Sequence, residues 1–166
     1  MSESTAAVVD IVPYEESMLE AVVALSLRAW EPVFESIARV MDDEVYREFH
    51  PDWRVSQRKG VEGACRDESI DVWVAVAESR PVGFVALAYH EENRMGEIYM
   101  IAVDPEHQRR GIATALTHLG LDLLKGAGMT TAMVETGGDP GHAPARRTYE
   151  SVGFGLFPIA RYFKKL

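Results

Sequence analysis

The chain has 166 residues, of which 47% are hydrophobic and 26% are charged, and its formal net charge is -9. This length suits one domain with its own core, and the composition lies outside the range of disordered chains. No apolar run reaches the roughly 18 residues that a membrane span needs. The N-terminal sequence MSESTAAVV lacks the features of a secretory signal. We therefore expect a single cytoplasmic domain over 1–166 with no membrane partner.

The first 70 residues predict one strand and three helices. Residues 6–12 form a short apolar run that predicts a strand. The next apolar residues recur every three or four positions, which predicts an amphipathic helix that ends near Trp30. Proline fits the first turn of a helix but not its interior, so Pro32 predicts the start of a second helix. A third helix is expected over 54–66.

The remaining residues predict an antiparallel sheet followed by alternating helices and strands. Expected strands are 72–77, 82–90, 96–103, 130–136 and one or two within 155–163, with helices from Ile112 to before Gly126 and over 145–151. The connections within 72–103 are short, which favours an antiparallel meander. The whole order indicates a mixed α/β fold in which helices cover a central sheet.

The distribution of charge and of metal-binding side chains excludes several functions. Residues 1–53 hold 12 acids and three arginines, whereas residues 54–166 hold 14 acids and 14 bases. This acidic segment disfavours nucleic acid as a partner and favours a cationic molecule, although solvated helix faces would have the same composition. Cys65 is the only cysteine, and the five histidines lack HxxxH or HExxH spacing. We therefore expect no disulfide and no metal site.

The segment HQRRGIATAL, residues 107–116, follows a strand and opens a helix. The first turn of a helix has unpaired N–H groups and a partial positive charge, so it binds anions. Gly111 allows a ligand to approach the backbone, and the two preceding arginines add charge. The segment lacks the lysine of a P-loop and the further glycines of a dinucleotide-binding loop. We interpret it as a diphosphate site, with a basic surface helix start as the alternative.

The pattern V-D-P-x-x-Q-R-R-G-I-A-x-A-L, residues 103–116, resembles the acyl-CoA-binding motif of the GNAT family of N-acetyltransferases. A later motif of that family is matched by Ala145, Tyr149, Gly153 and Phe154. The family often has an asparagine where this chain has His142. The two motifs and the strand between them cover residues 97–154, while residues 1–70 carry no specific match.

The resemblance implies a GNAT-like α/β fold, with a mixed, mostly antiparallel sheet of six to seven strands flanked by about four helices. Residues 1–70 would supply acceptor-side helices, and 71–166 the sheet and the CoA-binding core. The implied reaction transfers the acetyl group of acetyl-CoA to a primary amine by direct attack in a ternary complex. The expected contacts with acetyl-CoA are Ile101, Ala102, Val103, Gln108, Arg109, Arg110, Gly111, Ile112, Ala113, Thr114 and His142. Only one of the two arginines is expected to point into the site.

The resemblance also implies the groups that move protons. Tyr149 occupies the family's tyrosine position, and we expect it to act as the general acid that protonates the departing thiolate. Glu97 begins a strand where the family often carries a glutamate, and we expect it to act as the base, alone or through water. Glu135 is the alternative base.

The acceptor is expected to be a small cationic amine. Aromatic faces and carboxylates suit an ammonium group, and the candidate substrate contacts are Trp30, Glu31, Phe34, Tyr99 and Glu135. Acetylation of a protein N-terminus or lysine is one alternative, and a non-catalytic acyl-CoA-binding sensor is another. The apolar tail over 154–163 is a candidate homodimer surface.

Overall fold

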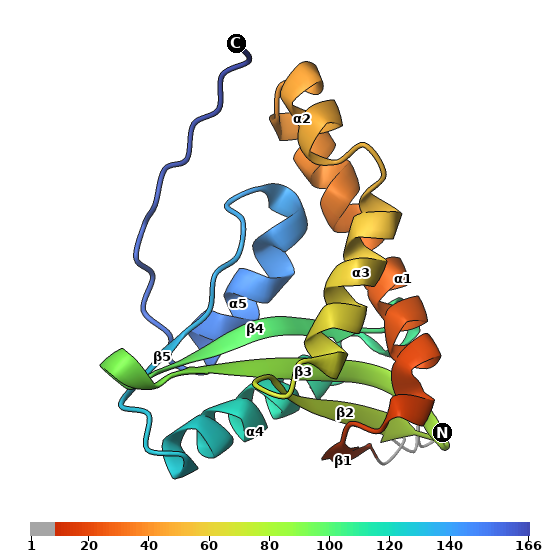
Figure 1. The fold of residues 1–166 in the computed structure, drawn as a ribbon, viewed down its shortest axis with the longest axis vertical. Coiled ribbons are helices and arrows are strands. Elements are labelled where there is room, and N and C mark those ends of the chain that lie inside the picture. The colour runs from red at the N-terminus through yellow and green to blue at the C-terminus, as the bar shows by residue number, and fades with distance from the viewer. Residues whose placement is uncertain (1–8) are drawn as a thin grey trace, which may run out of the picture.

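A five-stranded mixed sheet lies at the centre of the fold in a computed structural model, which describes residues 9–166 (Figure 1). In spatial order its strands are β1 (Asp10–Pro13), β2 (Asp71–Ala77), β3 (Arg80–His90), β4 (Met95–Val103) and β5 (Thr131–Met133). The first four strands pair antiparallel, whereas β5 runs parallel to β4. The predicted antiparallel meander is confirmed. Part of the first predicted strand, residues 6–8, lies outside the described residues.

Residues 9–166 contain five α-helices: α1 (Leu19–Val40), α2 (Asp43–Phe49), α3 (Trp53–Arg66), α4 (Ile112–Gly126) and α5 (Ala143–Ser151). Figure 1 shows α1 and α3 on one face of the sheet and α4 on the other. The predicted helices over 54–66, from 112 and over 145–151 are confirmed to within two residues. No helix in the described part of the chain is long and apolar enough to cross a membrane.

The central strand β3 shows how the sheet joins two apolar layers. Phe84 and Ala86 pack with buried residues of α1 and α3, while Val85 and Leu87 pack with those of α4. Successive strand residues point to opposite faces, so a strand covered on both faces has an almost continuous apolar sequence. The run VGFVALA in β3 follows from this arrangement.

The interface between α1 and α3 contains one buried polar pair. Ser26 lies among the buried apolar residues of α1, and its hydroxyl accepts a hydrogen bond of 2.9 Å from the Gln57 side chain of α3. A buried polar group is costly only when it lacks a partner. This bond therefore fixes the position of α3 along α1.

Pro32 lies inside α1, so the prediction of a separate helix from that residue is wrong. A proline within a helix removes one N–H donor, and here the residue is exposed, so water can reach the carbonyl that loses its partner. The helix continues because Phe34 and Ser36 are buried beyond the proline. The burial of Phe34 and Ser36 therefore outweighs the tendency of Pro32 to interrupt the helix.

The sheet has five strands, not the six to seven predicted. β5 covers three residues instead of 130–136, and residues 155–166 form no strand. Pro158 cannot donate to a strand ladder, which disfavours a strand within this tail. Figure 1 shows the tail running from the end of α5 toward α2, where Phe163 contacts Phe49 at 5.0 Å between ring centroids. The tail exposes several apolar side chains, of which Phe157 is 80% exposed. A homodimer surface on this tail stays a prediction.

Two glycines test how tightly the sheet packs on α4. A Cβ atom at Gly96 would lie 2.8 Å from Cγ of the buried Leu124, whereas one at Gly63 in α3 would meet nothing within 4 Å. Gly96→Ala should lower the free energy of unfolding by about 1–3 kcal/mol through overpacking. Gly63→Ala should raise it by about 0.5–1 kcal/mol because alanine favours helix. Urea unfolding of both variants measures the two changes in the free energy of unfolding. Equal changes in the two variants would contradict the close packing of Gly96 on Leu124.

Candidate functional site

β4 and β5 pair only at one end, where residues 95–97 face residues 131–133. Beyond Glu97 the outer edge of β4 has no strand partner among residues 9–166. A free strand edge presents main-chain N–H and C=O groups, which can pair with an extended ligand that carries amides. This edge contains the residues expected to contact the pantetheine arm, Ile101, Ala102 and Val103.

A β-bulge interrupts β4 at Tyr99. The residues on either side of it pair with the adjacent residues Leu87 and Ala86 of β3, so Tyr99 has no cross-strand partner. The extra residue interrupts the side-chain alternation after Tyr99, so that Met100 packs with the α1 and α3 layer and Ile101 with the α4 layer. The Tyr99 side chain is 49% exposed. It is therefore accessible beside the free edge of β4.

The loop that joins β4 to α4 leaves a row of main-chain N–H groups without acceptors. Within residues 9–166, the N–H groups of 109–114 have no hydrogen-bond acceptor, and the first helical bond runs from the Ala115 N–H to the Gly111 carbonyl. Arg109 and Gly111 both have left-handed backbones, with φ of 60° and 80°. Such turns gather N–H groups into a concave anion site at the positive end of a helix. The loop therefore fits a diphosphate.

Two side chains fix the shape of this loop. The Gln108 amide donates to the Val103 carbonyl at 3.0 Å, so this side chain, expected to contact the cofactor, is engaged within the protein. The Asp104 carboxylate accepts from the Glu106 N–H at 3.1 Å and pairs with Arg28 of α1. These bonds link the end of β4 to α1 and fix the course of the loop.

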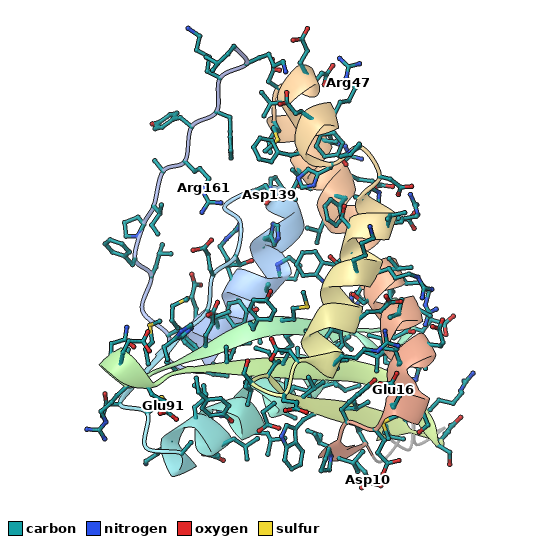
Figure 2. The ribbon with its side chains drawn as sticks, viewed as in Figure 1. Asp10, Glu16, Arg47, Glu91, Asp139 and Arg161 are labelled. Carbon is teal, nitrogen blue, oxygen red and sulfur yellow. The ribbon has the colours of Figure 1, made fainter. Side chains whose placement is uncertain are left out.

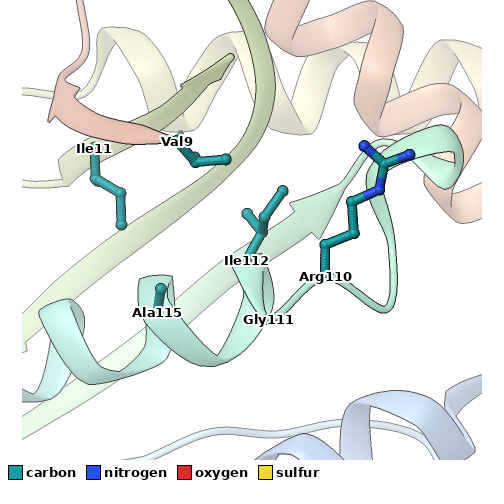
Figure 3. Close-up of a pocket in the computed structure, with 6 residues that line it drawn as sticks. All are labelled: Val9, Ile11, Arg110, Gly111, Ile112 and Ala115. Atoms are coloured by element: carbon teal, nitrogen blue, oxygen red, sulfur yellow. The ribbon is translucent and has the colours of Figure 1, made fainter. Parts of the chain in front are cut away.

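A small cavity adjoins the start of α4 (Figure 3). Its lining residues are Val9, Ile11, Arg110, Gly111, Ile112 and Ala115, and its volume is about 160 Å³. This is below the roughly 300 Å³ of a typical small-molecule pocket. Figure 3 shows Val9 and Ile11 on the opposite side of the cavity from Ile112. The cavity can hold part of a ligand, whereas the row of N–H groups extends beyond it.

Tyr149 is buried in α5, with 7% of its surface exposed. Its ring packs edge to face on Phe154, with 5.9 Å between centroids. Burial raises the pKa of Tyr149 to about 12, because removing water disfavours the phenolate. The phenol therefore keeps its proton at neutral pH, as a proton donor must.

The two candidate bases differ in their surroundings. The Glu97 carboxylate is 20% exposed and lies 2.8 Å from Nε2 of His90. The Glu135 carboxylate is 62% exposed and pairs with Arg161 of the tail at 3.3 Å. Figure 2 shows Arg161 on the tail beside the loop that follows β5. An exposed carboxylate that already pairs with arginine is a poor base, so the geometry favours Glu97.

The loop before α5 contains a buried polar cluster that sequence reasoning missed. The Asp139 carboxylate accepts from the Ser36 hydroxyl of α1 at 2.6 Å and bonds to Nδ1 of His142. The Gly141 N–H donates to the Ser36 oxygen at 2.8 Å. Figure 2 shows Asp139 in this loop, on the side of α5 that faces α1. Asp-Pro-Gly, with an aspartate before a 3-10 turn, was a local signal for Asp139, whereas Ser36 had none.

The aromatic residues of α1 and α3 form a cluster next to this loop. Phe34 is buried and stacks on Trp53 with 4.6 Å between centroids, so most of its surface cannot reach a ligand. Trp30 is half-buried and meets the His142 ring edge to face at 6.2 Å. Glu31 pairs with Arg54, whose guanidinium lies 4.3 Å from the Trp53 ring centroid. Of the three predicted contacts from α1, Trp30 and Phe34 lie side by side, and Trp30 also contacts His142.

The acidic first third is partly neutralised in space. Glu16, Glu20 and Glu31 pair with Arg66, Arg58 and Arg54 of α3. Surface pairs of this kind contribute little to stability, but they reduce the field that would attract a cation. Among residues 9–166, no three His, Cys, Asp or Glu side chains gather closely enough to hold a metal ion.

Comparison with known proteins agrees with this geometry. The sequence model of the acetyltransferase (GNAT) family matches residues 30–154. The mycothiol acetyltransferase of Thermomonospora curvata is 26% identical over 153 residues, which are 89% of this chain and 50% of that protein. The chain spans half or less of the length of the mycothiol acetyltransferases it matches.

Two solved structures share the fold. The PaiA N-acetyltransferase of Thermoplasma acidophilum, in complex with coenzyme A, has a TM-score of 0.69 and 15% identity, covering 92% of this chain and 93% of that chain. The aminoglycoside N-acetyltransferase AAC(6')-Iy, in complex with CoA, has a TM-score of 0.66 and 16% identity, covering 96% and 95%.

Gly111 provides a direct test of the anion site, and Gly128 is its matched control. Both glycines have left-handed backbones, with φ of 80° and 89°, and an added Cβ would meet nothing within 4 Å at either. Valine at either position should cost about 1–2 kcal/mol of stability through backbone strain. Only Gly111→Val should also weaken CoA binding, by about tenfold or more, which is about 1.4 kcal/mol. Isothermal titration with CoA measures this, and equal affinities in the two variants would contradict the site.

Proposed function

This chain belongs to the GNAT family of acetyltransferases, and we propose that it transfers the acetyl group of acetyl-CoA to the amine of a small cationic molecule. The observation that carries the proposal is the row of acceptor-free N–H groups at residues 109–114, next to the free edge of β4. Together these groups offer donors for a diphosphate and a strand for an amide-bearing arm. Acetyl-CoA contains both a diphosphate and an amide-bearing arm.

The residues present fit the donor substrate, which supplies an acyl group activated as a thioester. The N–H groups of 109–114 would hold the diphosphate, and one of Arg109 and Arg110 would add a charge-assisted bond. The backbone of 101–103 would pair with the pantetheine arm. A main-chain N–H there would polarise the thioester carbonyl, which in acyl transfer is worth about 3 kcal/mol.

Direct attack by the amine requires one group that takes a proton and one that gives a proton. In the proposal Glu97 accepts a proton from the reacting nitrogen, and Tyr149 donates to the departing sulfur. A covalent acyl-enzyme on cysteine would need a thiolate, but burial raises the pKa of the Cys65 thiol to about 11. This cysteine packs against the core between the sheet and α1, which supports a reaction without it.

The small cationic acceptor is supported by three observations. Trp30 offers an aromatic surface next to the loop before α5. The chain carries a net charge of -9, which attracts cations over a distance. Mycothiol and aminoglycoside acetyltransferases are among the proteins that resemble the chain in sequence or fold.

A thiol-release assay with acetyl-CoA and a panel of amines tests the proposal. The panel should include polyamines, aminoglycosides, an amino sugar thiol and a peptide with a free α-amine. We expect release that depends on a small cationic amine, and a loss of about 10²-fold or more in kcat for Tyr149→Phe with unchanged CoA affinity. Release with the peptide alone would favour the protein acetyltransferase. CoA binding without thiol release with any of the amines would favour the non-catalytic sensor.

The alkaline limb of the pH profile tests the role of Tyr149 separately. Because burial raises the pKa of Tyr149 to about 12, the protonated donor persists well above the ordinary tyrosine pKa near 10. The kcat of the wild type should therefore not fall between pH 8 and about 10 on account of this residue. A decline in kcat centred below pH 10 that Tyr149→Phe abolishes would show that the phenol titrates normally and contradict its burial.

A further inference from the structure

Asp139 and His142 form a carboxylate–imidazole pair beneath α1. Their side chains are 7% and 13% exposed, so both are almost entirely removed from water. Asp139 bonds to Nδ1 of His142 and also accepts from the Ser36 hydroxyl and the Gly141 N–H. The backbone of Gly137 lies directly against the pair, since a Cβ there would be 2.5 Å from His142 Nδ1. The bond between the two side chains is thus enclosed on the Nδ1 side.

This arrangement fixes which nitrogen of His142 can accept a proton. Burial raises the pKa of Asp139, but the hydrogen bonds from Ser36 and His142 outweigh it, and the net pKa lies below its ordinary value. Asp139 is therefore a carboxylate, which only accepts hydrogen bonds, so Nδ1 of His142 carries the hydrogen. Nε2 then holds a lone pair, and it has no hydrogen-bond partner among residues 9–166. Such an imidazole is oriented as a base.

The position of His142 relative to Tyr149 suits proton transfer at one reaction centre. His142 is the N-cap of α5, and Tyr149 follows seven residues later. Seven residues are close to two helical turns, so both side chains lie on one face of α5, about 10 Å apart along its axis. Long side chains on a helix lean toward its N-terminus, which brings the Tyr149 phenol toward His142.

The other neighbours of His142 place it on the acceptor side. Trp30 of α1 meets its ring edge to face, and α1 is the helix that carries the candidate acceptor contacts. Among the described residues, two further charged groups bond to this loop: Arg146 of α5 donates to the main-chain carbonyl of Asp139 at 2.9 Å, and Arg161 of the tail pairs with Glu135. Arg146 thus binds the main chain of the loop and not the Asp139 carboxylate, which bonds to His142.

We propose that His142 takes a proton from the acceptor ammonium through Nε2, and that Asp139 is the positioning residue that holds its ring. This inference rests on the proposed acetyltransfer. An ammonium that becomes an amide loses two protons, one before attack and one after it, so two acceptors are needed. An imidazole is a stronger base than a carboxylate, so it is better suited to take the first proton from an ammonium. Glu97 then takes the second, far more acidic proton.

The step balances in atoms and electrons. His142 takes one proton from the ammonium, and the nitrogen lone pair forms a bond to the acyl carbon. The carbon–sulfur bond breaks with its electron pair on sulfur, which takes a proton from Tyr149. Glu97 takes the remaining proton from nitrogen. His142 and Glu97 release their protons, Tyr149 regains one, and the net reaction sets free one proton, an amide and a thiol.

Chemical rescue tests the role of His142. His142→Ala should lower kcat with the best amine by about 10²-fold or more. Added imidazole should restore part of kcat in this variant, and none in Tyr149→Phe or Glu97→Gln. His142→Asn, the residue frequent in the family, should also lose kcat. The exposed His118 of α4 is the matched control, and His118→Ala should keep wild-type kcat. Full kcat in His142→Asn would overturn the proposal.

Two further variants separate positioning from loop anchoring. Asp139→Asn should lower kcat with little change in either KM, and nitrogen NMR should show the His142 hydrogen moving from Nδ1 to Nε2. Ser36→Ala removes the anchor on α1 but leaves the bond between Asp139 and His142, so its loss of kcat should be much smaller. Equal losses in the two variants, or a hydrogen on Nε2 in the wild type, would overturn the role of Asp139.

The outcomes also separate this inference from the proposed function. A wild type that releases no thiol with any amine contradicts the acetyltransfer, and the inference falls with it. A wild type that is active, with His142→Asn equally active, contradicts the inference alone.

Discussion

The separation of β4 from β5 beyond Glu97 is the constraint on which the rest of the site depends. If the two strands paired along their whole length, the edge of β4 would have no free N–H or C=O groups to offer a ligand. Two features of the structure keep them apart. The bulge at Tyr99 bends and twists β4 locally, and the bond from Ser36 to Asp139 holds the chain that follows β5 against α1. The ligand edge thus depends on an irregularity within β4 and on a contact between α1 and the loop that follows β5.

The sequence predicted the elements whose pattern is local. Strands of the meander and the amphipathic helices have periods of 2 and 3.6 residues, and the anion site follows from a glycine and a helix start. Prediction failed where a distant contact decides. Pro32 lies within α1 because buried residues beyond it continue the helix, and Ser36 meets Asp139 across 103 positions of sequence. A single sequence contains no trace of such a pairing.

The bulge at Tyr99 and the distribution of charge illustrate a second limit. Strict alternation assigns each side chain of a strand to the correct face until one extra residue shifts the register. No residue type in β4 predicts that shift. The first third of the chain is acidic when charges are counted along the sequence. In the fold, however, three arginines of α3 form ion pairs with glutamates of this segment. Acceptor preference therefore has to come from the groups near the loop before α5, where Trp30 and the Asp139–His142 pair lie, more than from the net field.

The high pKa of Tyr149 bears on whether a phenol can protonate a thiolate. A thiol in water has a pKa near 8.5, and a phenol at about 12 would be too weak an acid for it by a difference of about 3.5. However, the burial that disfavours a phenolate disfavours a thiolate in the same place. Cys65 shows the size of this effect in the same protein, since burial raises its pKa to about 11. A departing sulfur held beside Tyr149 would share its dry surroundings, which raise the pKa of a thiol in the same direction as that of the phenol. The burial of Tyr149 is therefore compatible with its role as the acid.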